Sequence, residues 1–522
     1  MNKIFKYMAL AMGVFFLGSC EEYLDEVPVT SISVDYIFDS PDGLDVGITS
    51  LYNLMRRNNF PAFGDNGGNP MKANLFFYVG TDLGHTRTWH RPYDISAMSP
   101  QGFPEYKWTR AYEIIDRASG IIAAASQMEG DEAQLNRIEA EAKAMRGECY
   151  FDLIRMYDNI ILDTTAVTPQ NANDPQVFEV ANPADVYAVI KSDLDFAIEH
   201  LEWSVASGRY GQGAVRHIRG KVAMWESDWS EAASQFDAII DDGTHYLVGL
   251  NEVFGQDVNH SESLFTYQRD EDLGTTAGNG DNTAGGRGTW HSSVFNNRAY
   301  EMSTGEIVQS AEYGGQALGW SFPNDYLQSL YDQDNDRRYT TYYYPLTKYV
   351  NAPGHPNFGE EISVYDDNFR RHHFSLKKFH DEDKAVLTND SWKDDMYYRF
   401  AETLLLSAEA HWRMSGSDTD AKALEYINMI RERAFGNSDH NFTTFNLDIY
   451  LEESARELAF EKNRWFLLKR MGLLVERQQM YYTYGSSSTN QILEPMAPHM
   501  VRLPIPQSQI DLMGTFPQNP GY

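Results

Sequence analysis

Cysteine, long apolar runs and positive charge are all scarce in this sequence of 522 residues. Cys20 and Cys149 are the only cysteines, so a framework of several disulfides is excluded. After the first twenty residues no apolar run approaches the roughly eighteen residues that a membrane helix needs, which argues against a further membrane span. Aspartate and glutamate outnumber lysine and arginine by 75 to 43, and the resulting net charge of -32 argues against nucleic acid as a partner.

The first nineteen residues are predicted to be a signal peptide, because a short positive region precedes an apolar stretch over residues 8–17. Residues 17–20, Leu-Gly-Ser-Cys, resemble a bacterial lipobox, so Cys20 is the predicted lipidation site. An ordinary secretory signal with a chance cysteine is the alternative. The acidic residues that follow resemble a tract that directs some lipoproteins to the cell surface, although a solvated linker has the same composition. Cys149 lies in an apolar helical stripe and is predicted to be core.

Apolar residues recur at helical spacing along much of the chain, first over residues 138–156, where successive steps are 4, 3, 4, 4 and 3. Asn182 before Pro183 supplies a helix cap and a first-turn proline, and Ser417 or Asp418 is expected to cap a later helix. The same spacing predicts helices over residues 43–56, 105–127, 183–201, 214–226, 229–240, 400–411, 418–434 and 451–471.

These helices come in consecutive pairs joined by short polar turns, in the manner of tetratricopeptide units, although no strict 34-residue repeat is present. The predicted fold class is mostly α: a scaffold of about four such pairs with long irregular loops and minor β-structure. The loops fall mainly over residues 58–104 and 247–395. Their dense aromatic residues argue against disorder and predict that they form the ligand face.

Five elements near the C-terminus resemble, in order, those of the SusD/RagB family. Residues 399–410, Arg-Phe-Ala-Glu-Thr-Leu-Leu-Leu-Ser-Ala-Glu-Ala, are similar to the family's Arg-x-Ala-Glu-x-x-Leu-x-x-Ala-Glu-Ala pattern. Residues 428–434 match its Asn-x-x-Arg-x-Arg-Ala element, and residues 456–465 resemble its Arg-x-x-Glu-Leu-x-Phe-Glu-x-x-Arg-Trp run. Leu-Pro-Ile-Pro over residues 503–506 and Gln-Asn-Pro-Gly-Tyr over residues 518–522 close the series.

The charged residues of these elements lie on helices with apolar stripes, and their predicted role is pairing between packed helices. The resemblance divides the chain into a signal peptide (1–19), an N-terminal region with helix pairs (20–250) and a C-terminal region (251–522). In the last, a loop-rich insertion (251–395) precedes the signature helices (396–522), and one compact mature unit is expected. The charged residues of the five elements that are predicted to pair between packed helices are Glu402, Glu409, Arg431, Arg433, Arg456, Glu457, Glu461 and Arg464.

The resemblance implies a non-catalytic lipoprotein, anchored in the outer membrane and facing the extracellular side. It also implies a glycan ligand, an oligosaccharide or polysaccharide, that is delivered to a SusC-like TonB-dependent transporter. A peptide or other nutrient, as in RagB-type lipoproteins, is the alternative ligand. A surface glycoside hydrolase is the rival class, and it needs two carboxylates about 5 to 10 Å apart, one with a raised pKa.

Aromatic rings that stack on sugar faces beside hydrogen-bonding groups are the chemistry that a glycan site needs. Seven ligand-binding residues are predicted. Four lie close together in the first loop region, over residues 58–104, and two tryptophans and a tyrosine lie in the second, over residues 247–395. A loop tryptophan that plugs a local core is the alternative, and five tryptophans on helical stripes are predicted to be core: Trp108, Trp225, Trp229, Trp412 and Trp465. The predicted ligand-binding residues are Trp89, Asp82, Arg91, Tyr93, Trp290, Trp320 and Tyr326.

No cofactor, metal ligand or catalytic residue is predicted. His85 and His90 are five residues apart, and His372 and His373 are adjacent, but neither pair has a Glu-x-x-His frame or nearby cysteines. A structural calcium ion held by oxygen atoms of acidic loops is left open, although no twelve-residue EF-hand loop is present. No Gly-x-Ser-x-Gly elbow supports a serine nucleophile.

Overall fold

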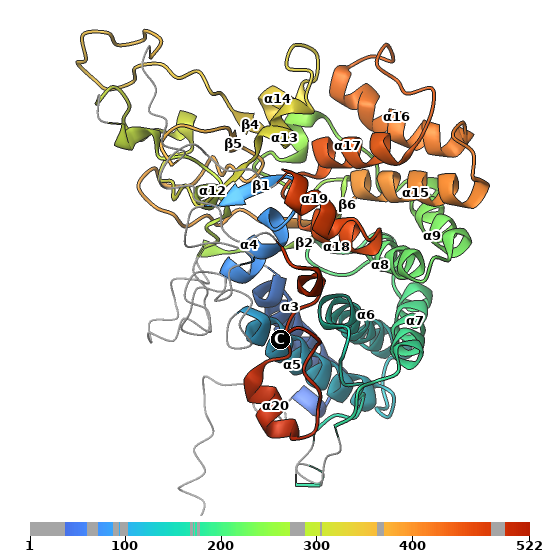
Figure 1. The fold of residues 1–522 in the computed structure, drawn as a ribbon. Helices are drawn as coiled ribbons and strands as arrows, with labels where there is room; N and C mark the ends of the chain where they lie inside the picture. Colours follow the sequence, from blue (N-terminus) through green and yellow to red (C-terminus); the bar gives the residue numbers. More distant parts are fainter. Residues whose placement is uncertain are drawn as a thin grey trace, which may run out of the picture.

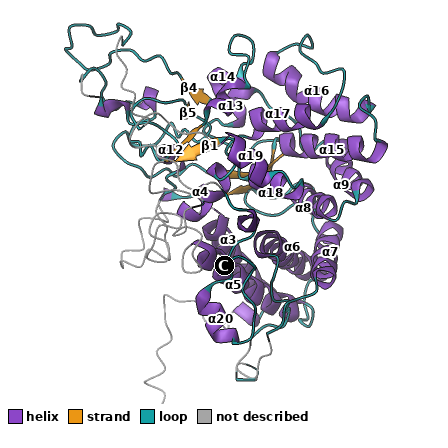
Figure 2. Ribbon diagram, viewed as in Figure 1, coloured by secondary structure: helices purple, strands orange, loops and turns teal. Residues whose placement is uncertain are grey.

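Helices dominate the protein, and its strands are few and short (Figure 2). This arrangement confirms the predicted mostly helical class with minor β-structure. For residues 71–74 the description is of the backbone alone. The computed structural model describes residues 37–59, 71–86, 93, 103–167, 171, 173–174, 178–271, 288–302, 305–362, 370–481 and 496–522.

Seven helices pack one against the next in a row, and most of this row lies along the right side of Figure 1. This row is called the helical stack below. Each of the helices predicted for this row is present with ends shifted by a few residues. They are α5 (Phe103–Ala125), α6 (Glu132–Tyr157), α7 (Pro183–His200), α8 (Gln212–Trp225), α9 (Trp229–Asp242), α15 (Phe400–Ser415) and α16 (Ala421–Phe435).

The helix starts in the stack follow from local side-chain chemistry. The Asn182 side chain accepts a hydrogen bond from the Ala184 N–H at 3.1 Å, as expected of an N-cap before Pro183. The predicted cap of α16 was wrong by two residues, because Asp420 is the residue that accepts from the Ala423 N–H, at 2.9 Å. Asp418 instead accepts from the indole N–H of Trp412 at 3.3 Å.

The single helix predicted over residues 451–471 is wrong, because the chain breaks there into α17 (Leu447–Leu458) and α18 (Asn463–Arg470). Phe460 and Lys462 have φ angles of 62° and 67°, in the left-handed region that non-glycine residues rarely adopt. The break lets the Phe460 ring enter a buried cluster, and it lets the Lys462 ammonium group donate to the Asn59 carbonyl at the end of another helix. Burial and hydrogen bonding outweigh the backbone strain.

Helices α9 and α15 are in direct contact although residues 243–399 separate them in the chain. This long insertion, called the lobe below, projects from the stack at the upper left of Figure 1. Its base is closed by antiparallel pairing of β2 (Ser263–Tyr267) with β6 (Asp395–Arg399). Its other short elements are α10 (Leu250–Val253), α12 (His291–Val294), η2 (Ala299–Glu301), η3 (Ala311–Tyr313), β3 (Ser321–Pro323), α13 (Asp325–Ser329), α14 (Arg338–Thr341), β4 (Tyr343–Tyr344) and β5 (Ser375–Leu376).

The remaining elements belong to neither the stack nor the lobe. Strand β1 pairs antiparallel with β3, so a buried segment from the N-terminal part of the chain joins the lobe. Strand β4 pairs with β5 inside the lobe. These remaining elements are α3 (Pro41–Asn59), α4 (Met71–Val79), β1 (Gly84–Thr86), α19 (Leu474–Tyr481), η4 (Pro498–Val501) and α20 (Gln507–Met513).

Two large cores hold these parts together. The first runs along the helical stack and contains Trp108 and Trp465, at 1% and 0% exposure, which confirms their prediction as core residues. Trp225 and Trp412 are only partly buried at its edge, as Trp229 is at the edge of a smaller cluster. The second core joins residues of the lobe to α4 and to the segment after α17. Among its buried rings are Tyr78, Trp320, Tyr342, Tyr343, Phe374 and Phe460.

Candidate functional site

A buried network of charges joins the lobe to the C-terminal helices. Arg399, the last residue of β6, contacts Glu262 and Glu457 at 2.8 Å each and Glu461 at 2.6 Å. Burial raises the pKa of Glu457, but Arg433, Arg399 and other nearby cations together hold it well below its ordinary value. Glu457 therefore stays ionised, and the network of ion pairs fixes the base of the lobe.

The other signature charges tie helix to helix. Glu402 on α15 accepts from Lys221 at 2.9 Å and from His217 at 3.0 Å, both on α8. The Glu409 carboxylate is bound by both terminal nitrogens of Arg470 on α18. These contacts, with those of Arg399, confirm that the charged residues of the C-terminal elements pair between packed segments. Replacing one member would leave its partner buried and unpaired.

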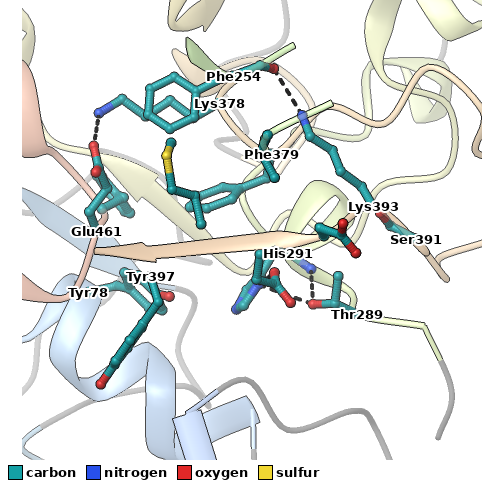
Figure 3. Close-up of a pocket in the computed structure, with 15 residues that line it drawn as sticks. Tyr78, Phe254, Thr289, His291, Lys378, Phe379, Ser391, Lys393, Tyr397 and Glu461 are labelled. Atoms are coloured by element: carbon teal, nitrogen blue, oxygen red, sulfur yellow. Dashed lines mark hydrogen bonds and ion pairs between the residues drawn. The ribbon is translucent and has the colours of Figure 1, made fainter. Parts of the chain in front are cut away.

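A pocket lies beside β6, where the lobe meets α4 and the residues after α17 (Figure 3). Aromatic rings make up one part of its wall and polar side chains the other, which is the mixture that small-molecule sites use. The lining residues are Tyr78, Phe254, Val258, Thr289, His291, Lys378, Phe379, Ser391, Lys393, Asp394, Asp395, Met396, Tyr397, Phe460 and Glu461.

The two pocket lysines are bound to protein acceptors. Figure 3 shows Lys378 turned toward Glu461, with 2.7 Å between Nζ and Oε1, and Lys393 turned toward the Phe254 carbonyl, at 2.9 Å. Burial lowers the pKa of each lysine to about 8, which still leaves most of each population charged at neutral pH. Both lysines therefore hold the pocket wall in place.

The pocket carboxylates are also engaged. Asp395 accepts from the Arg269 Nε at 2.6 Å, and Arg269 and His291 hold its pKa below the ordinary value despite burial. Burial raises the pKa of Asp394, which accepts from the Arg269 backbone N–H at 2.7 Å and from the Asn259 amide at 2.8 Å. The pKa of Asp394 is thus raised and that of Asp395 is lowered, and both carboxylates accept hydrogen bonds from groups of the protein.

Trp290 lies in the chain between Thr289 and His291, two residues that line this pocket. Its neighbour Thr289 exchanges both backbone hydrogen bonds with Ser391, and the Trp290 indole N–H donates to Asp390 Oδ1 at 2.8 Å. The Trp320 ring packs edge-on against Trp290, with ring centroids 6.1 Å apart. Trp320 is 6% exposed, whereas Trp290 is only partly buried. The structure therefore brings these two predicted residues together and leaves part of the Trp290 ring accessible.

A second aromatic group surrounds Tyr326. Its ring stacks on Tyr481 with centroids 3.8 Å apart, and Arg477 donates to its hydroxyl at 2.7 Å. Arg477 is in turn held by Asp82, which also binds Arg464 at 2.7 Å. Tyr326 and Tyr481 are partly buried, so a half-exposed stacked pair rests on a buried ion pair.

Three of the predicted ligand-binding residues do not face solvent: Asp82, Tyr93 and Trp320, which is 6% exposed and belongs to the second core. Asp82 is fully buried, and burial raises its pKa while Arg464 and Arg477 lower it to a net value below the ordinary one. Tyr93 is 3% exposed, and its hydroxyl donates to the Gly80 carbonyl. These side chains support the surface from beneath, so the expectation of direct ligand contact is corrected. Trp89, Arg91 and Cys20 lie outside the described residues.

Sequence reasoning missed Asp390, Arg477 and Tyr481. Tyr481 carried a signal, because it begins an aromatic run, Tyr-Tyr-Thr-Tyr over residues 481–484, at the end of a helical pattern. Asp390 and Arg477 carried none, since each is defined by a partner about one hundred residues away or more.

Within the described ranges, no three histidine, cysteine, aspartate or glutamate side chains come together as a metal site would require. His85 and His373 pack ring against ring at 4.9 Å, while His90 lies outside these ranges. None of the helices that the structure describes combines the length and the apolar composition needed to cross a membrane.

Known proteins resemble this chain in sequence and in fold. The profile of the SusD family matches residues 363–522. A SusD-like protein P25 from Formosa agariphila is 24% identical over 96% of this chain and 95% of its own length, and a SusD-like protein from Bacteroides ovatus is 23% identical over 88% and 81%.

Solved structures give the same result for the fold. A laminarin-binding SusD-like protein superposes with a TM-score of 0.69 at 22% identity, over 92% of this chain and 99% of that one. Surface glycan-binding protein A from Bacteroides thetaiotaomicron, solved with laminarihexaose, gives a TM-score of 0.69 at 19% identity over the same shares. The helical stack, the five C-terminal elements and these matches agree: residues 363–522 match the SusD family, and over 92% of the chain the fold is that of SusD-like structures.

Proposed function

We propose that this chain is a non-catalytic binding protein of the cell surface that captures an oligosaccharide or polysaccharide. It then delivers this ligand to a SusC-like TonB-dependent transporter of the outer membrane. Lipid on Cys20 would hold the protein at that membrane on its extracellular side. Relatives whose names include laminarin or a glycan support the ligand class.

The observation that carries the proposal is the partly exposed ring of Trp290 beside a pocket. Its indole N–H is fixed by Asp390 and its edge by Trp320, so the ring is held in one orientation before any ligand arrives. A rigid aromatic face loses little conformational entropy when a sugar ring stacks on it.

The carboxylates near the pocket support binding without a reaction. Asp394 and Asp395 both line the pocket, and protein donors occupy each of them: Asp394 accepts from the Arg269 backbone N–H and from Asn259, and Asp395 accepts from the Arg269 Nε. Glu461 is held by Lys378 and Arg399. Each of these groups has a structural partner that proton transfer would have to displace.

Calorimetry of the purified protein, without its signal peptide and lipid, against a panel of polysaccharides tests the binding role, with laminarin included because of the relatives. Trp290→Ala is expected to lower affinity at least tenfold without changing the unfolding midpoint by more than a few degrees. Trp412→Ala, a partly buried tryptophan on the helical stack, is the matched control and should bind as the parent does. If no polysaccharide binds, or if Trp290→Ala binds normally, the proposed site is wrong.

The rival enzyme class is separated by an assay for new reducing ends on every polysaccharide that binds. The proposal expects none above the rate without protein. Sustained turnover that is abolished by Asp394→Asn or Glu461→Gln would show that the protein is a hydrolase and not a non-catalytic binding protein. Co-purification with an outer-membrane transporter, lost when Cys20→Ala prevents membrane anchoring, tests the delivery role. Binding of peptides in place of every polysaccharide would favour the RagB-type alternative.

A further inference from the structure

A second pocket lies against the other strand of the sheet that closes the base of the lobe. The pocket beside β6 takes residues 395–397 from that strand, whereas this one takes residues 263–266 from β2. The turn between α7 and α8, over residues 203–211, forms much of its remaining wall. It is called the β2 pocket below. Its volume is about 180 Å³, against about 40 Å³ beside β6, so it is the roomier of the two.

Two glycines let the walls of the β2 pocket approach each other closely. Gly208 has a φ angle of 80°, and a Cβ atom there would stand 2.6 Å from Cγ of Gln268, the residue after β2. A Cβ atom on Gly213, in the first turn of α8, would stand 2.6 Å from Nε2 of His245. Larger residues at these two positions would push the walls apart. The pocket is therefore held in shape before any ligand arrives, which lowers the entropic cost of binding.

Hydroxyl side chains supply most of the polar lining of the β2 pocket. They belong to Ser204, Ser207, Thr244, Ser261, Ser263 and Thr266. Throughout the part of the chain that the structure describes, no protein group is hydrogen-bonded to the hydroxyls of Ser204, Ser207 and Ser261. The pocket beside β6 differs, because both of its lysines and both of its aspartates are bound to protein groups. The β2 pocket thus keeps hydrogen-bonding groups available for a ligand.

The β2 pocket offers a ligand little charge, although the whole chain carries a formal charge of -32. Among the described residues that line it there is no aspartate or glutamate. Its arginine, Arg209, is neutralised from outside the pocket by Asp45 at 3.2 Å and by Glu141 at 3.0 Å. Burial lowers the pKa of His245, so this ring is neutral at pH 7. A neutral polar ligand therefore suits the pocket better than an ion does.

An aromatic ring completes the pocket. Trp203 is half-buried and packs against the core of the helical stack. The guanidinium group of Arg216 lies over this ring, 5.4 Å from its centroid, and is itself held by the side-chain oxygens of Gln212 at 3.2 Å and Gln235 at 3.0 Å. The ring is thus fixed beside the hydroxyl groups, and an apolar ring next to hydrogen-bonding groups is the combination that a sugar needs.

We propose that the β2 pocket is a second carbohydrate site, which binds a neutral sugar unit through the ring of Trp203 and the hydroxyls of Ser204, Ser207 and Ser261. The class of ligand rests on the proposed function, but the site itself does not depend on Trp290. A serine hydroxyl both donates and accepts hydrogen bonds, so it matches sugar hydroxyls, which do the same. A polysaccharide that reaches both pockets gains affinity from the second attachment.

The test is calorimetry with neutral hexasaccharides: laminarihexaose, cellohexaose, maltohexaose and mannohexaose. The Trp290→Ala protein should still bind at least one of them. Adding Ser207→Phe, which places a ring in the β2 pocket, should lower this remaining affinity at least tenfold. Ser234→Phe places the same ring at an exposed serine of α9 and should change nothing. Trp203→Ala should act as Ser207→Phe does, and if it does not fold, Ser207→Phe on the exposed turn decides.

Raising the salt from about 0.05 to 0.5 M should leave the affinity of the Trp290→Ala protein unchanged, because a neutral ligand has no charge to screen. A tenfold loss would overturn the ligand class. If Trp290→Ala alone abolishes hexasaccharide binding, or if Ser207→Phe leaves the remaining affinity unchanged, there is no second site and the proposed function stands. Polysaccharide binding by a parent protein that binds no hexasaccharide has the same meaning. Absence of all carbohydrate binding overturns both.

Discussion

The helical stack and the lobe satisfy their backbone polar groups in different ways. In the stack nearly every peptide group bonds within its own helix, so side chains are free to pack, cap or pair. In the lobe the strands have two to five residues, and side chains complete the hydrogen bonding. Asn297, Asn324, Lys384 and Lys393 each donate to backbone carbonyls there. A substitution in the lobe thus removes packing and backbone support together.

The largest expected effect is at the junction of the two regions. Glu457→Ala leaves Arg399, Arg433 and Arg338 buried around a missing charge, and should lower the free energy of unfolding by about 3 to 5 kcal/mol. Urea denaturation measures this. Glu452→Ala on the same helix is the control, because its carboxylate is 45% exposed and its contact with Arg456 is 3.6 Å long, and it should cost less than about 1 kcal/mol. Equal losses would show that the network is dispensable.

Two asparagines that both cap a helix, one in each region, allow the cost of losing a side chain to be compared between the lobe and the stack. Asn324 in the lobe caps α13 by accepting from the Leu327 N–H at 2.9 Å, and its amide also donates to the carbonyls of Asp82 and Tyr481 at 2.8 Å each. Asn324→Ala should therefore cost about 2 to 4 kcal/mol. Asn182→Ala in the stack removes a cap alone and should cost about 1 kcal/mol. Thermal and urea unfolding measure both, and similar costs would contradict the contrast.

Acid should weaken the stack through Asp237. Burial raises the pKa of this carboxyl group, but hydrogen bonds from His411, Lys422 and Ser407 lower it to about 2, against 3.8 in the unfolded chain. Its stabilisation is therefore complete above pH 3.8 and is lost as the pH falls through about 2. Asp237→Asn should cost about 1 to 2 kcal/mol at pH 7 and almost nothing at pH 2. Asp241→Asn, exposed on the same helix, should follow the parent at every pH.

The smallest expected effect is at the far part of the lobe. The Phe358 side chain is 62% exposed, so Phe358→Ala should change the free energy of unfolding by less than about 0.5 kcal/mol. If the ligand binds beside Trp290, affinity should also stay at the parent value. A tenfold loss of affinity in calorimetry, with stability unchanged, would move the ligand site toward this end of the lobe.

Much of the stack could be predicted from the sequence, because a helix forms from neighbours three and four residues apart. The spacing over residues 138–156 predicted α6, and Asn182 with Pro183 predicted the start of α7. The break between α17 and α18 could not be predicted, since it depends on a pocket for Phe460 and on the distant carbonyl of Asn59.

The site was less predictable for the same reason. Trp290 and Trp320 were predicted as ligand-binding residues because long loops rich in aromatic residues favour ligand binding, but their contact with each other was not predicted. Asp82 was expected at the surface as a polar loop residue, but Arg464 and Arg477, almost 400 residues later, bury it.

The contact between α9 and α15 has a consequence for how such genes diversify. Residues 243–399 leave the scaffold and return to it at neighbouring points, so recombination can exchange this segment for another without separating the helices at its ends. Glu262 and Arg399 mark the parts that every exchanged segment must retain, because their ion pair seals its base. Paralogues that share the helical stack are then expected to differ mainly in residues 243–399. Chimaeras joined at the two ends of this segment should have the ligand preference of the protein that donated it.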